Sequence, residues 1–530
     1  MQLKEEKTGH LYLSEGRSIL GLYVIFVLIV AYFVLRYGAW WGGGMDPSFF
    51  TTSIREMLNT NKLIPDILVY PNGYGYQAVT IILVQLTGLN LVFMQEIGSK
   101  IVALWVLLPI WLFFREITGT RRAAVLATII MLVQPEFLFA ILRGTHEYYS
   151  RGLMFLCLYF LVRSFRAWKN TMHFFNYVIC FYLCAYALIT FNNLLATSFI
   201  LSLGIALIFS WIIFWRLKIL PSNIIPIRRL LYAAITCVVL AFIYTFFVYA
   251  PAQNNILLMD SIWERIGALI LDMEEKAANP YGTIYSSWVN LPIYFILSLS
   301  NWLLLAISAL IWLGQLVSMV LGRWEKKFAN IILLWAFYGA FAFLGAITIL
   351  VDLSGVLAQN LQHRLFPAFA MLAAPLTASW YSLWVPKRKW IKQKISILGR
   401  FGFAVLFIFS VMKATTEPLL SNKWRVVLPG EVEAVEWSLE NIGEEEMIWV
   451  GYDERLTARV FTEGLASKIN RRVDNREIDP RTKNILFSDL IFLRSIRISQ
   501  PIPIGYDDYL IYDNGHAKIF HTRSHSYYQP

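Results

Sequence analysis

Apolar runs of about 20 residues recur along most of this chain and constrain its fold more than any other feature. A helix of that length spans the ~30 Å hydrocarbon core of a bilayer. The runs extend from Ile19 to Met412, and about 11 of them are long enough to cross. Only 15% of the residues are charged, against about 25% in soluble domains. We therefore predict a mainly α-helical, polytopic transmembrane bundle over residues 1–412.

Basic residues cluster between the apolar runs, and the clusters predict the orientation of the bundle. Basic loops preferentially face the cytoplasm. This rule places the N-terminus in the cytoplasm, leaves the poorly basic loops outside, and indicates a multi-pass protein of the plasma membrane. The same clustering accounts for the net charge of +11, so nucleic acid is not expected as a partner. The clusters lie at residues 115–122, 163–169, 216–229, 323–327 and 387–400.

The first outer loop, residues 37–96, contains an ambiguous segment from Tyr76 to Phe93 that is apolar enough to span. If it crossed the bilayer, every later basic cluster would change sides and the charge pattern would invert. Polar and glycine residues such as Gln85 and Gly88 also interrupt it. We therefore predict that this segment is a re-entrant or interfacial helix in the outer leaflet.

The composition changes after Met412, where charged residues become frequent. This region contains segments with helical spacing, short apolar runs typical of strands, and the hairpin signal Asn514-Gly515. Residues 413–530 are therefore predicted to form a small extracytoplasmic α/β domain. Its expected elements are helices at 431–441 and 456–465, strands at 447–452 and 485–492, and a hairpin at 509–520.

Asp46 is the first candidate for chemistry. It follows the first apolar run closely, in a long loop that has few other acids near it, and long loops in compact proteins are often functional. A carboxylate at the membrane surface, with apolar neighbours, is suited to deprotonate a hydroxyl as a general base. Asp46 also precedes Pro47, a combination typical of a helix start. The capping and catalytic roles are compatible with each other.

Three features of this region occur together. They are the early acid in the loop, an arginine-rich inner sequence after the next span, and the turn Tyr70-Pro71-Asn72-Gly73-Tyr74 before an apolar helix. This combination resembles the GT-C superfamily of membrane glycosyltransferases. Protein O-mannosyltransferases, aminoarabinose transferases and oligosaccharyltransferase catalytic subunits belong to that superfamily. The resemblance implies that Asp46 is catalytic. The C-terminal region lacks a Trp-Trp-Asp-Tyr-Gly signature, which argues against a standard oligosaccharyltransferase.

The second outer loop, residues 143–151, packs Arg143, His146 and Glu147 beside two tyrosines. Polar residues at a membrane edge are usually functional or mutually paired. The resemblance implies a second catalytic acid in this loop, and Glu147 is the matching residue, which would orient the acceptor or hold a metal. The alternative is an arginine–glutamate ion pair within an interfacial aromatic belt.

His363 and Arg364 end the last outer loop, before Phe366 and a Pro-Ala pair. An arginine at the mouth of a span can extend its side chain to lipid headgroups. Its planar fork also suits the phosphate of a lipid carrier. Many members of the superfamily carry a similar arginine-aromatic stretch before a late span, which implies that Arg364 binds phosphate.

Together these residues predict a glycosyltransferase that inverts the anomeric centre. A polyprenyl-phosphate sugar, hexosyl or pentosyl, would be the donor, and its phosphate would contact Arg364, with His363 or Arg143 beside it. Asp46 would accept the proton of the acceptor hydroxyl, which belongs to a glycan, a lipid or a protein. Membrane lipid and the lipid-linked sugar are the other expected partners.

Three tyrosines of the first loop, Tyr70, Tyr74 and Tyr76, could offer ring faces to the sugar, with His146 as a further substrate-binding residue. Interfacial anchoring is the alternative role for each tyrosine. No metal site is expected, because Asp46, His146 and Glu147 supply few ligands and the Asp-x-Asp pattern of metal-dependent relatives is absent. A divalent metal stays open as an alternative, and no other cofactor is expected.

The competing hypothesis is a polytopic transporter or flippase of a lipid-linked saccharide. Such proteins carry charged residues and broken helices near the bilayer midplane. In this sequence the polar residues lie at the outer ends of spans, with Asn192-Asn193 as the main interior exception. A catalytic site at the outer surface therefore explains the pattern better.

Overall fold

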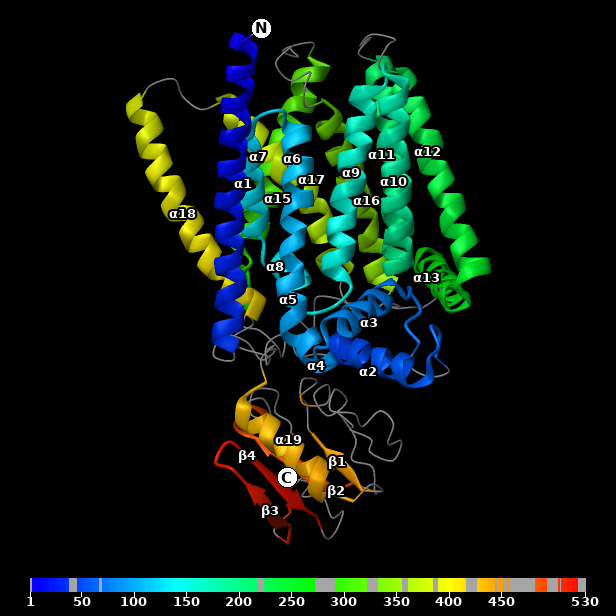
Figure 1. Ribbon diagram of the computed structural model, residues 1–530, viewed down its shortest axis with the longest axis vertical. Coiled ribbons are helices and arrows are strands. Elements are labelled where there is room, and N and C mark those ends of the chain that lie inside the picture. The colour runs from blue at the N-terminus through cyan, green and yellow to red at the C-terminus, as the bar shows by residue number, and fades with distance from the viewer. Residues whose placement is uncertain are drawn as a thin grey trace.

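The computed structural model has one large helical bundle, a layer of shorter helices across one end of it, and a small α/β unit (Figure 1). These features confirm the predicted fold class. The structure describes residues 2–37, 45–65, 69–216, 224–271, 291–321, 332–354, 361–384, 389–415, 427–443, 446–450, 456, 482–492, 504–505 and 507–522.

Seven helical segments in these ranges are long and apolar enough to cross a membrane, which identifies a membrane-embedded protein. Most of them line up along the long axis of the molecule (Figure 1). They are α1 (Gln2–Tyr37), the continuous run Leu91–Thr118 that ends in α6 (Leu107–Thr118), α10 (Thr171–Phe191), α11 (Asn193–Arg216), α12 (Ile224–Ile243), α15 (Leu299–Val320) and α16 (Ile332–Ser354).

Further helices complete the bundle. Two shorter ones form an eighth candidate span that bends by 75° at its break. Three further long helices run within or beside the bundle (Figure 1). By length and composition, the described part of the chain has 7 candidate spans, or up to 8 with the bent pair, against the prediction of about 11. The bent pair is α7 (Arg121–Leu132) with α8 (Pro135–Leu142), and the long helices are α9 (Glu147–Ala167), α17 (Leu361–Trp384) and α18 (Lys389–Thr415).

The apolar run over residues 123–142 is not one straight helix, because it bends between α7 and α8. Pro135 lacks a backbone N–H and disfavours helical backbone at the residue before it. Gln134 accordingly has an extended conformation, with φ −85° and ψ 117°. As a result α8 leaves the axis of α7 and leads the chain to Arg143.

The predicted first outer loop contains α2 (Met45–Thr60) and α3 (Gly75–Thr87), which lie across one end of the bundle (Figure 1). With 13 residues, α3 is too short to cross a bilayer, as the charge pattern predicted. Its C-terminus is closed by Gly88 in the left-handed conformation, with φ +67°, whose N–H donates to the carbonyl of Val84. Another short helix, α13 (Asn254–Ile270), lies at the same end.

The opposite end of the bundle gathers basic side chains from separate loops. Arg163 and Arg166, near the end of α9, contact Glu116 of α6 at 3.3 and 2.9 Å. Arg115 contacts Glu15 of α1 at 2.8 Å. Two of the predicted inner clusters thus lie at one end, and α2 and α3 lie at the other.

The C-terminal unit contains the predicted helix and sheet around a separate hydrophobic core. Its strand order is β1-β2-β4-β3, with β1 and β2 parallel and the other pairs antiparallel. The predicted hairpin is confirmed, with Gly515 at φ +82°, but the predicted helix at 456–465 lies almost wholly outside the described residues. The elements are α19 (Pro429–Asn441), β1 (Met447–Trp449), β2 (Thr482–Ser488), β3 (Tyr509–Asp513) and β4 (Ala517–His521).

Candidate functional site

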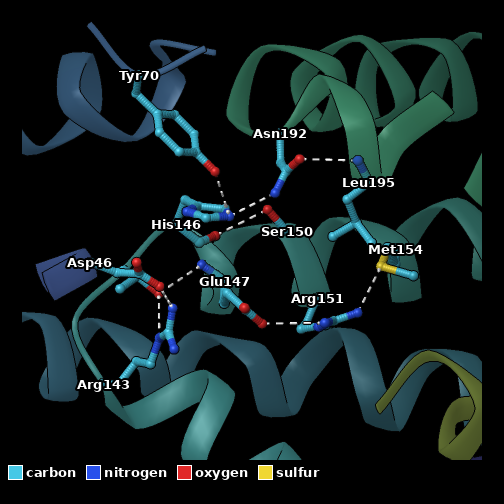
Figure 2. Close-up of polar contacts among 11 residues, drawn as sticks. Asp46, Tyr70, Arg143, His146, Glu147, Ser150, Arg151, Met154, Asn192 and Leu195 are labelled. Atoms are coloured by element: carbon cyan, nitrogen blue, oxygen red, sulfur yellow. Dashed lines mark hydrogen bonds and ion pairs between the residues drawn. The ribbon is translucent and has the colours of Figure 1, made fainter. Parts of the chain in front are cut away.

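Asp46 and Arg143 form an ion pair at the end of the bundle where α2 and α3 lie (Figure 2). Arg143 Nη2 donates to Asp46 Oδ2. Asp46 belongs to the first turn of α2, where the helix dipole favours a negative charge, and its side chain is 53% exposed. An exposed carboxylate at this position can receive a proton from a bound hydroxyl.

The loop that carries Arg143 is shaped by Gly144. This residue has φ +68°, and an added Cβ would lie 2.7 Å from the carbonyl oxygen of Gln95. Tyr76 of α3 donates hydrogen bonds to Gln95 Oε1 and, at 3.0 Å, to the Gly144 carbonyl. The close approach of these backbones therefore requires glycine, and it fixes the second outer loop against the first.

Glu147 pairs with Arg151 one turn further along α9, with 3.2 Å between Oε2 and Nη2. Arg151 is only 3% exposed. The ion pair that the sequence offered as the alternative explanation is therefore present. It leaves Glu147 half-buried beside the Asp46–Arg143 pair (Figure 2), so that two carboxylates and two guanidinium groups lie together at the start of α9.

His146 lies beside this group and contacts both Tyr70 and Asn192 (Figure 2). Asn192 Oδ1 accepts from the N–H of Leu195, which orients the amide so that Nδ2 donates to His146 Nε2 at 2.7 Å. The Tyr70 hydroxyl lies 3.5 Å from the same nitrogen. An imidazole nitrogen that accepts a hydrogen bond belongs to the neutral ring. His146 is 6% exposed and is held by these hydrogen-bond partners, and its predicted contact with substrate stays a prediction.

Acidification is expected to destabilise the protein through His146. The pKa of this imidazole is lowered from 6.5 to about 4, chiefly by burial; Glu147 and Asp46 raise it, and the nearby arginines lower it. The unfolded chain therefore binds a proton near pH 6.5, whereas the folded protein binds it only near pH 4. Stability should fall as the pH drops through this window, by about 3 kcal/mol in all. Thermal unfolding between pH 7 and pH 4 measures the effect.

The matched variant is His146→Gln, whose side-chain oxygen can accept from Asn192 without titrating. It should lose the part of the pH dependence that belongs to the imidazole. Equal slopes of stability against pH in the two proteins would contradict the assignment of a buried neutral histidine.

The three candidate tyrosines occupy different environments. Tyr70 is half-buried, and burial raises the pKa of its hydroxyl above the usual value, so it remains a neutral donor. Tyr74 packs its ring against Tyr244 and Tyr249. Tyr76 is 1% exposed, and its ring contacts Phe50 and two tyrosines of α9. Tyr76 has no free face for a sugar, and we assign it a structural role.

His363 and Arg364 lie in the first turn of α17, and their side chains lie outside the described part of the structure. α16 ends at Ser354, whose carbonyl accepts from Arg265 of α13 at 3.3 Å. Because α17 begins soon after this point, its first turn lies toward the end of the bundle that carries Asp46 (Figure 1).

Sequence reasoning did not assign Asn192 and Tyr249 to the site. Asn192 lies between α10 and α11, and Tyr249 donates to the carbonyl of Tyr70 at 2.6 Å. The usable signal was the pair Asn192-Asn193 within an apolar run, since amides are rare in such runs unless they have partners. Asn193 N donates to the carbonyl of Asn72 at 2.6 Å, which attaches the 69–74 segment to α11.

Within the described ranges, no group of three or more His, Cys, Asp or Glu side chains is arranged to hold a metal ion. Asp46 and Glu147 are each engaged by an arginine. A divalent cation at either carboxylate would have to compete with a guanidinium group.

Comparisons with known proteins rest on structure. No protein-family model and no curated protein sequence matches this chain. Archaeal oligosaccharyltransferase AglB from Archaeoglobus fulgidus, solved with an inhibitory peptide and a dolichol-phosphate, superimposes with a TM-score of 0.54 at 12% identity, over 89% of this chain and 69% of that chain. ArnT from Cupriavidus metallidurans in the apo state superimposes with a TM-score of 0.52 at 14% identity, over 94% and 97% of the two chains.

Both of these structures are membrane glycosyltransferases of the GT-C superfamily. The superpositions cover 89% and 94% of this chain, and they agree with the resemblance that the loop sequences carry. This chain therefore has the fold of the GT-C membrane glycosyltransferases.

Proposed function

We propose that this protein is a membrane glycosyltransferase that moves a sugar from a polyprenyl-phosphate donor to an acceptor hydroxyl on the outer face of the membrane. The observation that carries the proposal is the half-exposed carboxylate of Asp46 beside the guanidinium of Arg143, at one end of a GT-C bundle. The pair combines a proton acceptor with a group that binds phosphate. The basic clusters at the opposite end support an outward-facing site.

The reaction would be a single displacement with inversion. Asp46 accepts the proton of the acceptor hydroxyl while the acceptor oxygen attacks the anomeric carbon. The bond from that carbon to the phosphate oxygen breaks, and its electron pair leaves with the lipid phosphate. Arg143, with Arg364 from α17, would neutralise the negative charge that develops on the leaving group. Glu147, held by Arg151, would orient the acceptor.

The donor class has support from one neighbour of the same fold. AglB was solved with a dolichol-phosphate, which is a polyprenyl phosphate. By extension, the lipid tail of the donor would lie along the apolar helices and its phosphate would reach the membrane edge. Residues 1–412 would then form the catalytic part, and residues 413–530 an accessory domain on the same side.

The full-length protein in lipid nanodiscs should transfer label from a polyprenyl-phosphate-linked hexose or pentose to an acceptor. Mass spectrometry of the glycans lost when the gene is deleted would identify that acceptor. Transfer should continue in EDTA, because a metal ion at Glu147 would have to displace Arg151. If reconstituted protein instead moved the lipid-linked sugar between leaflets without breaking its bond to phosphate, the transporter hypothesis would replace this one.

A further inference from the structure

The two arginines of the site differ in how firmly they are held. Arg151 is buried, and it pairs with Glu147 on the same helix, so their separation is set by one turn of α9. Arg143 is 16% exposed and joins two separate segments, the end of α8 and the start of α2. Its guanidinium also lies over the Phe139 ring at 5.1 Å and donates through Nε to Thr145 Oγ1 at 3.4 Å.

The contact between Arg143 and Asp46 affects the group that the reaction needs. Asp46 Oδ2 accepts a hydrogen bond from Nη2, and an adjacent guanidinium favours the ionised carboxylate, so it weakens Asp46 as an acceptor of the hydroxyl proton. The same N–H groups of a guanidinium also bind phosphate. The carboxylate of Asp46 and the donor phosphate therefore compete for the guanidinium of Arg143.

We propose that Arg143 exchanges between Asp46 and the phosphate of the donor, so that Asp46 becomes a more effective base when the donor is bound. This inference rests on the proposed function and adds to it a coupling between donor binding and the basicity of Asp46. Donor phosphate would attract the guanidinium, release Oδ2, and allow the acceptor hydroxyl to approach. When the lipid phosphate leaves after transfer and Asp46 has lost its proton, the ion pair would form again.

The exchange would have two consequences for the enzyme. Asp46 accepts the proton of the acceptor hydroxyl more readily once the donor has bound. Arg143 also moves only locally, because its Thr145 and Phe139 contacts belong to its own segment. The Glu147–Arg151 pair would remain in place and keep the start of α9 fixed while the exchange occurs.

The test measures how readily a water-soluble carbodiimide and a glycine ester modify Asp46 in the full-length protein in nanodiscs. The probe is polyprenyl phosphate without sugar, and mass spectrometry of the peptide containing Asp46 gives the extent of labelling. Polyprenyl phosphate should raise the labelling of Asp46 by roughly fivefold, as expected on release from an exposed ion pair. Labelling of the exposed Glu436 on α19 should stay unchanged and serves as the internal control.

Variants of Arg143 sharpen the result. Arg143→Gln should label quickly at Asp46 with or without the lipid, and Arg143→Lys should retain part of the protection. Arg166→Gln, at the opposite end of the bundle, should behave as the wild type does. Since the wild-type measurement needs no substitution, a variant that does not fold leaves the test intact.

Binding of polyprenyl phosphate is measured separately by native mass spectrometry. This measurement distinguishes a failure of the proposed exchange from a failure of the proposed function. Bound lipid with unchanged or reduced labelling of wild-type Asp46 would overturn the exchange and leave the proposed function standing. Absence of lipid binding would overturn the proposed donor class, and the exchange with it.

Discussion

Replacing Asp46 with asparagine is expected to lower the rate of sugar transfer by about 10²- to 10⁴-fold, the range that a positioned general base contributes. Asparagine keeps the shape of the side chain and can still accept a hydrogen bond from Arg143, but it cannot take up a proton. Because Asp46 is 53% exposed, folding should be nearly unaffected. Transfer from a polyprenyl-phosphate sugar, measured together with thermal unfolding, tests both statements.

Asp260→Asn is the matched control for this experiment. Asp260 is an exposed aspartate on α13, a short helix at the same end of the bundle as α2. The control should transfer sugar at the wild-type rate. Normal turnover by Asp46→Asn would remove Asp46 from the chemistry and leave it only its favourable position in the first turn of α2.

Gly73→Ala is expected to be the most destabilising of the proposed substitutions. Gly73 has φ +145°, a conformation that residues with a side chain rarely adopt, and an added Cβ would overlap the carbonyl of Thr190. Backbone strain of this kind costs about 1–3 kcal/mol, and the overlap adds to it. The 69–74 segment would move away from α10, and Tyr70 would separate from His146. Both the thermal midpoint and sugar transfer should therefore fall.

The control for Gly73→Ala is Gly204→Ala on α11. A Cβ at Gly204 meets no atom within 4 Å, and alanine in a helix interior is favoured over glycine by about 0.5–1 kcal/mol. This variant should be as stable as the wild type or slightly more so. A thermal midpoint for Gly73→Ala equal to that of Gly204→Ala would show that the 69–74 segment adapts without cost.

The spans could be predicted because each depends on its own composition and length. The sequence also predicted that α3 does not cross the membrane, from the charge of the later loops. It predicted the hairpin from the dipeptide Asn514-Gly515. The bend after Val133 was within reach of the same reasoning, because Pro135 is visible in the sequence. Hydropathy alone does not show the bend, because it does not register the loss of a backbone donor at proline.

The site was only partly predictable. The sequence indicates Asp46, Glu147 and Arg143 as site residues, because polar side chains at the ends of spans are usually functional or mutually paired. Their pairing was not predictable, since Asp46 and Arg143 are 97 residues apart in the chain. The sequence suggested that Arg143 faces a phosphate, whereas the structure places it on the carboxylate of Asp46. That difference is the basis for the proposed exchange.

Burial separated the remaining candidates. His146 and Tyr76 have polar groups that suit a sugar, but packing between α2, α3 and α9 encloses both side chains. Asn192 and Tyr249 belong to the same network, through the hydrogen bonds to His146 and to the Tyr70 carbonyl. Residue type alone does not distinguish a side chain that contacts substrate from one that supports it.

The sequence by itself determined that this chain resides in a membrane, where most of its helices cross, and which loops carry its unusual polar residues. Those properties follow from local hydrophobicity and from the positions of charge along the chain. Only the tertiary structure decided which acid meets which arginine, and that His146 is enclosed and neutral. These outcomes depend on how α2, α3, α8 and the start of α9 pack at one end of the bundle, because burial and pairing arise from contacts between segments far apart in the sequence.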